Sequence, residues 1–163
     1  MGTLYMAVPR ATNIPVVVAT GTVVKTLLQV ATPSTTDIRV HAWGVSFAGI
    51  VASNPAGICV LTDVDVAATV TALTPEKWES DSAQASLCVG GASATGYNAS
   101  AEGSIGATTR ILDAQHVHPQ TGYSVFWPEG RHSGVKASRF LRVRATFSVD
   151  VNALPWILYE EPA

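Results

Sequence analysis

A long alternation of apolar and polar residues near the C-terminus constrains this chain more than any other feature. From Leu141 to Val151 every second residue is apolar, and the residues between are polar or charged: Arg142, Arg144, Thr146, Ser148 and Asp150. Side chains of a β-strand point to alternate faces, so the pattern predicts a strand with one dry and one solvent-facing side. The same period recurs along most of the chain, and no helical period competes with it.

Clusters of Pro, Gly, Ser and Asn separate the alternating segments at roughly the 8–12-residue spacing that is typical of sandwiches and barrels. The 163 residues are enough to bury one core. We therefore predict an all-β fold, a jelly-roll-like sandwich or barrel of about eight to ten antiparallel strands, forming a single domain over residues 14–163. Residues 1–13 lack the alternation, and we expect them to form an N-terminal arm.

The alternation changes phase within residues 37–47. One set of apolar positions is followed by a second set on the opposite face: Ile38, Val40 and Ala42, then Trp43, Val45 and Phe47. A slip of one residue beside Gly44 predicts either a β-bulge or a strand that passes from one sheet to another.

Three further segments carry local signals. Thr74-Pro75-Glu76 resembles a helix start, with a capping hydroxyl before a proline, and predicts one or two helical turns before Ser80. The Gly-, Ala- and Ser-rich stretch Gly90–Gly106 predicts a loop or an edge strand that carries Tyr97. Pro155–Glu160 predicts a short final strand at a sheet edge.

The low charge of the chain indicates contacts with other subunits. Charged residues make up 13% of the sequence, against roughly 25% in average domains. We expect part of the surface to be buried against other subunits. A net charge of −2 gives no case for nucleic-acid binding, and no apolar segment is long enough for a membrane span. The N-terminus lacks a secretory pattern, so Cys59 and Cys88 are expected to be buried free thiols.

The charges are unevenly distributed along the chain. Residues 58–102 hold six acids and one base, whereas residues 110–144 hold six bases and two acids. Two interpretations stay open: opposite patches that pair between neighbouring copies, or solvated strand faces.

Few residues suggest catalysis. His116 and His118 have a spacing that metal ligands use, and a cupin-like site would add Glu129 and His132. A cupin also needs a carboxylate a few residues after His118, where this chain has none, so we expect no metal. There is no nucleophile elbow, phosphate loop or dinucleotide motif, and we expect no enzyme activity, catalytic residue or cofactor.

The four tryptophans could line a sugar site, but spaced aromatic residues in an all-β chain are mostly core or interface anchors.

Several segments resemble small virion proteins of tailed bacteriophages. They are Val40-His-Ala-Trp-Gly-Val-Ser-Phe-Ala-Gly, Ala99-Ser-Ala-Glu-Gly-Ser-Ile, Phe140-Leu-Arg-Val-Arg-Ala-Thr and the closing Pro-Trp-Ile-Leu-Tyr-Glu-Glu. The resemblance implies a capsid decoration (cement, or auxiliary head) protein, a trimer on the outer shell whose partner is the major capsid protein.

Such a protein would be made in the host bacterial cytoplasm and end on the capsid surface of the virion. The alternative is a tail or fibre module that binds a host-surface glycan. The residues expected to contact partner proteins are aromatic residues and arginines: Tyr5, Arg10, Trp127, Arg131, Arg142, Arg144 and Trp156.

Overall fold

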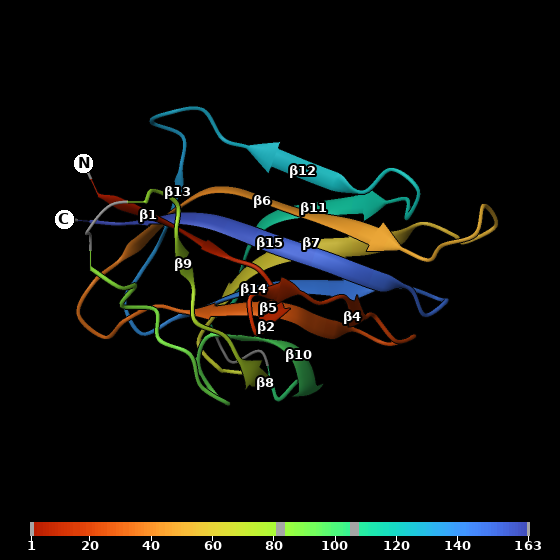
Figure 1. The fold of residues 1–163 in the computed structure, drawn as a ribbon, viewed down its shortest axis with the longest axis horizontal. Helices are drawn as coiled ribbons and strands as arrows, with labels where there is room; N and C mark the ends of the chain where they lie inside the picture. Colours follow the sequence, from red (N-terminus) through yellow and green to blue (C-terminus); the bar gives the residue numbers. More distant parts are fainter. Residues whose placement is uncertain (1, 81–83, 105–107, 163) are drawn as a thin grey trace.

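The computed structural model describes residues 2–80, 84–104 and 108–162. Two antiparallel β-sheets face each other as a sandwich (Figure 1), and no helix occurs within those ranges. The prediction of an all-β sandwich is confirmed.

Sheet I contains seven strands. In spatial order they are β12 (Tyr123–Phe126), β6 (Ile38–Ala48), β15 (Asn152–Glu161), β1 (Thr3–Ala7) and β9 (Glu76–Lys77), with β13 (Ser133–Val135) beside β6 and β4 (Val18–Ala19) beside β15. Sheet II contains β11 (Arg110–Val117), β7 (Gly57–Val64), β14 (Phe140–Thr146), β5 (Lys25–Ala31), β10 (Gly96–Ala101) and β8 (Thr69–Ala72). A separate small hairpin joins β2 (Arg10–Ala11) and β3 (Ile14–Pro15).

Eight of the strands pair in a nested order. Among β1, β5, β6, β7, β11, β12, β14 and β15, the first strand pairs with the last, the second with the seventh, the third with the sixth and the fourth with the fifth. Successive pairs belong to alternate sheets: β1–β15 and β6–β12 lie in sheet I, and β5–β14 and β7–β11 lie in sheet II. The pairing of β15 with β6 joins the two pairs of sheet I, and the pairing of β14 with β7 joins those of sheet II. The chain is thus one long antiparallel ribbon rolled into two layers.

The core lies between the layers and contains the dry face predicted from the C-terminal alternation. Leu141, Val143 and Ala145 are buried, and Phe147 is 2% exposed. Val149, expected on the same face, is exposed because β14 ends at Thr146 and the chain turns before β15 begins. Both cysteines are buried and unbonded, as expected.

The phase change in β6 is a β-bulge. Leu158 of β15 pairs with Ala42, but the next residue, Tyr159, pairs with Val40, so His41 is the extra residue. The bulge keeps Val40 and Trp43 buried on the inner face although three positions separate them. The strand stays in one sheet.

Three local predictions are wrong. Residues Glu76–Lys77 form strand β9 and not a helix, because the free edge of β1 pairs with them and Leu4 accepts a hydrogen bond from the Trp78 amide at 2.9 Å. The final strand is central, between β6 and β1, and not at an edge. Tyr97 lies on β10, which is flanked by β5 and β8; Ile105 and Gly106 of the same predicted segment lie outside the described residues.

The segment expected to be an N-terminal arm contributes to sheet I. Residues 3–7 form β1, in register with β15 from Thr3↔Glu161 to Ala7↔Ile157. Tyr5 and Ala7 are buried in the core. The prediction of a free arm over residues 1–13 is therefore wrong at residues 3–7. Strand β1 has only five residues, too few for their alternation to stand out in the sequence.

Candidate functional site

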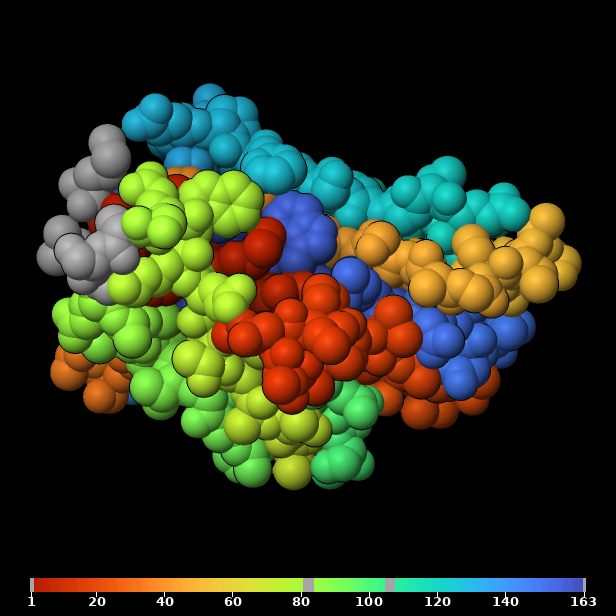
Figure 2. Space-filling model, in the orientation of Figure 1, coloured from red at the N-terminus to blue at the C-terminus, as the bar shows by residue number. Residues whose placement is uncertain are grey.

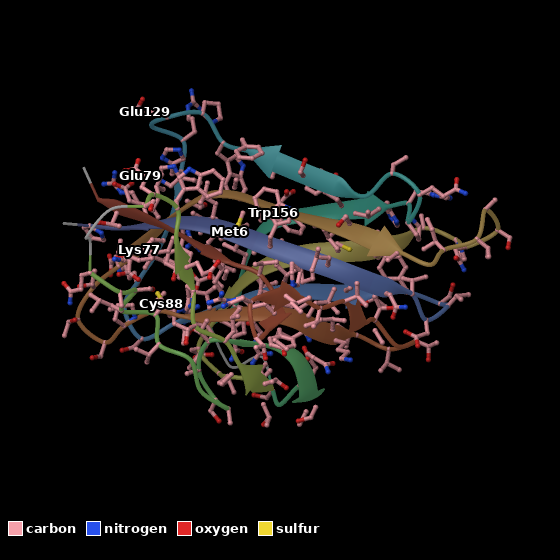
Figure 3. All side chains as sticks on the ribbon, in the orientation of Figure 1. Met6, Lys77, Glu79, Cys88, Glu129 and Trp156 are labelled. Carbon is pink, nitrogen blue, oxygen red and sulfur yellow. The ribbon has the colours of Figure 1, made fainter. Side chains whose placement is uncertain are left out.

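The outer face of sheet I carries the most distinctive surface of the molecule. Strand β15 alternates, so that Leu154, Trp156, Leu158 and Glu160 point outward while Ala153, Ile157 and Tyr159 enter the core. Large rings from other elements lie on the same face, with Phe126 of β12 66% exposed and Trp78 52% exposed. Figure 3 shows Trp156 and Met6 over the middle of the sheet.

The Trp156 indole lies flat against the sheet. Gly44 is its partner on β6, and a Cβ added to Gly44 would lie 2.7 Å from Trp156 Nε1 and 2.8 Å from Cε2 and Cζ2. The glycine is thus required for the ring to rest on the backbone. The Phe126 ring packs against the indole, with 5.6 Å between the ring centroids and the planes tilted by 42°. The two rings form a fixed aromatic platform.

A groove of about 860 Å³ lies on the same face, nearer the chain termini. Its lining comes from the start of β1, from β6, from the end of β15, from the residues after β9 and from the β12–β13 connection: Gly2, Thr3, Leu4, Arg39, His41, Glu79, Glu129, Gly130, His132 and Glu160. In Figure 2 the blue-cyan β12–β13 connection and the yellow-green residues around β9 border this part of the face.

Two histidines and one glutamate form the inner wall of the groove. His41 Nε2 lies 3.0 Å from Glu160 Oε2, and its ring stacks on His132 with 3.7 Å between centroids. The hydrogen bond to His41 lowers the pKa of Glu160, helped by the backbone amide of Gly2, which donates to Glu160 Oε1 at 2.5 Å. Glu160 is therefore held as a carboxylate in a fixed orientation.

Two more carboxylates stand at the rim. Glu79 and Glu129 are on the same side of the molecule (Figure 3), and neither has a hydrogen-bond or ion-pair partner among the described residues. Among the described residues of the lining, Arg39 is the one arginine or lysine. The groove therefore offers several hydrogen-bond acceptors beside an apolar platform.

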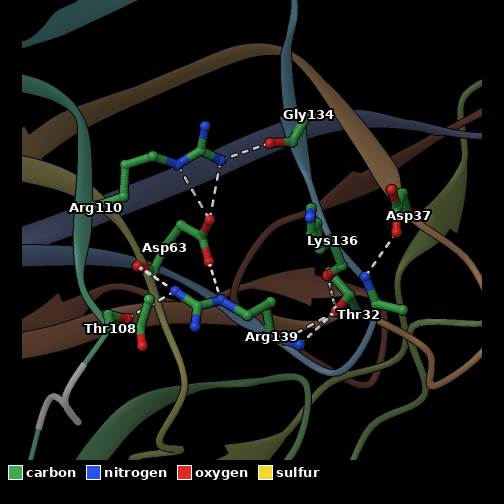
Figure 4. Close-up of polar contacts among 9 residues, drawn as sticks. Thr32, Asp37, Asp63, Thr108, Arg110, Gly134, Lys136 and Arg139 are labelled. Carbon is green, nitrogen blue, oxygen red and sulfur yellow. Dashed lines mark hydrogen bonds and ion pairs between the residues drawn. The ribbon is translucent and has the colours of Figure 1, made fainter.

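Most of the basic C-terminal residues pair with the acidic segment of the same chain. Asp63 is 5% exposed and accepts from Arg110 Nη2 at 2.9 Å and from Arg139 Nε at 2.7 Å (Figure 4). Glu102 accepts from Arg144 Nε at 2.8 Å and lies 3.7 Å from Arg142 Nη1. Four of the six bases thus bind acids of the same chain, which answers the open question about the charge asymmetry for these residues.

The residues expected at partner interfaces have diverse positions. Tyr5 is buried, and its hydroxyl donates to the Gln84 carbonyl at 2.6 Å. Arg142 is fully buried beneath residues 66 and 102, and burial lowers its pKa. These two side chains are not on the surface.

The other five candidates are at or near the surface. Arg10 pairs with Glu76, Arg144 pairs with Glu102, and Trp127 is half-buried against the core. Arg131 and Trp156 remain as surface candidates, and the structure places only Trp156 in the aromatic platform.

The histidines considered as metal ligands do not converge. His116 is exposed on β11, and His118 Nδ1 accepts from the Gln120 amide at 3.2 Å, whereas His132 stacks on His41. Within residues 2–80, 84–104 and 108–162 no three His, Cys, Asp or Glu side chains form a group that could hold a metal. The same ranges contain no helix that could cross a membrane.

A second surface is apolar and lies at the end of the sandwich opposite the termini (Figure 1). This loop end consists of residues 20–24, 49–56 and 147–151, which connect β4–β5, β6–β7 and β14–β15. Its exposed side chains include four valines: Val23, Val24, Val51 and Val149. Residues 20–24 and 147–151 are tied together by the Thr20 amide, which donates to the Val151 carbonyl at 2.9 Å, and by the Gly21 amide, which donates to Asp150 at 2.8 Å.

Comparisons with family models, with curated proteins and with solved structures find no match to this chain.

Proposed function

We propose that this chain is a structural virion protein of a tailed phage, a homotrimer that decorates the head and stabilises it by bridging subunits of the major capsid protein. The nested pairing of eight of its strands supports a jelly-roll topology, which viral capsid domains share with lectins and cupins. One architecture serves many functions, so the function has to be argued from the surface that would bind the capsid.

The observation that carries the proposal is the apolar loop end. Val23 is 71% exposed and Val51 is 60% exposed. The loop of Val23 is hydrogen-bonded to residues 147–151, and the loop of Val51 is held by hydrogen bonds between Val51 and Asn54. Exposed apolar patches mark sites of protein contact. Valine is stiff at χ1, so little rotamer entropy is lost when such a side chain is buried in an interface. The loop end therefore suits docking on a preformed protein surface.

Stabilisation of the head follows from mass action. A subunit that binds the assembled shell and not its free components shifts the equilibrium toward the shell. Three copies joined around one axis would contact several capsid subunits at once, which raises the effective concentration of each contact.

Co-sedimentation with empty shells of the phage that encodes this chain tests the proposal. The double variant Val51→Asp/Val149→Asp should bind the shells at least about tenfold more weakly than wild type. Val89→Asp is the matched control, since Val89 is 66% exposed in the connection between β9 and β10. Equal pelleting of the double variant and wild type would contradict the role of the loop end.

The same protein sample distinguishes the head proposal from the alternative function. A wild-type protein that ignores shells but binds host cells would replace the head proposal with a tail or fibre module.

A further inference from the structure

We propose that the outer face of sheet I also holds a carbohydrate-binding site, in which a neutral oligosaccharide stacks on Trp156 and extends into the groove beside Glu160. The groove and the loop end are separate surfaces, near opposite ends of the sandwich. Sugar binding can therefore succeed or fail independently of shell binding.

The aromatic platform supplies the apolar contact. One face of the Trp156 indole rests on Gly44, and the tilted Phe126 ring packs against it with 5.6 Å between centroids. The opposite face of a ring held in this way can receive the C–H face of a pyranose, because an aromatic face is electron-rich and attracts C–H groups. A ring that is already fixed loses little entropy on binding.

The spacing along β15 favours an oligosaccharide over a single sugar. Trp156 and Glu160 are four residues apart on the same face of the strand, which corresponds to about 13 Å at the rise of a β-strand. Leu158 lies between them and is only 6% exposed, so neighbouring side chains form the surface of this strip. A chain of sugar rings can cross this strip from the platform to the carboxylates.

The polar groups of the groove define the chemical class. Glu79, Glu129 and Glu160 are acceptors for sugar hydroxyls. The His41 ring contacts Glu160, and His132 stacks on His41. Three carboxylates against one arginine, Arg39, disfavour ligands that carry carboxylate or sulfate groups. Neutral hexose or N-acetylhexosamine chains, which offer hydroxyls without negative charge, fit the site.

A protein partner fits the groove less well. The cores of protein interfaces are depleted in Glu and Asp, and burial of the Glu79 and Glu129 carboxylates without partners is costly. Sugar hydroxyls satisfy these acceptors while the rim remains open to water.

A glycan array of neutral, amino-sugar and acidic oligosaccharides tests the inference, followed by calorimetry with the best neutral ligand. Wild-type protein should bind neutral oligosaccharides, and Trp156→Ala should bind them at least about tenfold more weakly. Ile111→Ala is the control, since Ile111 is 63% exposed on β11 of the other sheet. Thermal melting reports whether each variant is folded.

A second variant keeps the test valid if Trp156→Ala does not fold. Glu79→Gln/Glu129→Gln changes two exposed rim residues without partners among the described residues, and it should lower affinity for the same ligand severalfold. The inference is overturned if no neutral glycan binds, if acidic glycans bind in preference, or if the folded variants bind as tightly as wild type.

Discussion

The Trp43 indole on β6 donates a hydrogen bond of 3.1 Å to Asp113 on β11 and so joins the two sheets at one side of the sandwich. The Tyr123 hydroxyl on β12 donates to the same carboxylate oxygen at 2.8 Å. Trp43 is fully buried, and its ring packs at 5.3 Å from that of Tyr123. One carboxylate thus satisfies polar groups from two strands of the opposite sheet.

Replacement of this carboxylate should weaken the fold. Asp113→Ala leaves the Trp43 indole N–H and the Tyr123 hydroxyl without their acceptor, and we expect a loss of about 1–3 kcal/mol in the free energy of unfolding. Asp113→Asn retains an acceptor oxygen and should lose less. Urea denaturation of the three proteins gives the comparison, and equal stability of wild type and Asp113→Ala would exclude the carboxylate as a link between the sheets.

The same cluster predicts a loss of stability at alkaline pH. Burial, and then the hydrogen bond to Asp113, raise the pKa of Tyr123 to about 12, whereas an unfolded tyrosine titrates near 10. A raised folded pKa contributes stability that is complete below pH 10 and is lost as the pH rises toward 12. The unfolding free energy of wild type should therefore fall more steeply between pH 10 and 12 than that of Tyr123→Phe. Parallel pH profiles of the two proteins would contradict the assignment.

Neighbouring residues of one segment should differ strongly in their contribution to stability. Phe147 packs edge-on against Phe47 at 5.4 Å and covers Gly57, so Phe147→Ala should cost about 3–5 kcal/mol. Thr146 is exposed, and Thr146→Ala should cost well under about 1 kcal/mol. Chemical denaturation measures both, and similar losses would mean that the two faces of the segment are misassigned.

The contact between Gly44 and Trp156 can be measured with a double-mutant cycle. Gly44→Ala introduces a methyl group into space that the indole occupies, and overpacking of this kind costs about 1–3 kcal/mol. In a Trp156→Ala background the same change should be nearly neutral. A coupling energy of at least about 0.5 kcal/mol is expected, and additive effects would show that the indole does not rest on the glycine.

The oligomeric state is open to direct measurement. We expect native mass spectrometry at micromolar concentration to give a trimer, since the chain is only 13% charged and exposes large apolar side chains. Light scattering of the same sample provides an independent mass. A monomer by both methods would contradict the trimer.

The period-two pattern predicted the fold class because it depends only on which face of a strand is buried. It failed at Arg142, which lies on the face expected to be wet but is fully buried. There the outer face of sheet II is covered by other segments of the chain, and Arg142 donates to the carbonyls of Val66 and Glu102. Nothing in residues 139–151 indicates that cover.

The candidate groove could be predicted only in part. Trp156 was singled out from the sequence, but His41 and Glu160 are 119 residues apart and meet through the register of β6 with β15 and the bulge at His41. The phase change signalled the bulge without revealing its partner. The predicted helix after Thr74 is likewise absent, because Glu76 and Lys77 pair with the edge of β1. Local sequence does not encode that pairing.

A cryo-EM reconstruction of empty shells incubated with the purified protein tests the central claim most directly. The account predicts trimeric density on the outer surface of the shell, with Val51 and Val149 of the loop end toward the capsid and the groove beside Glu160 uncovered. Shells without added density, or density that contacts the capsid through the outer face of sheet I with the loop end in solvent, would contradict it.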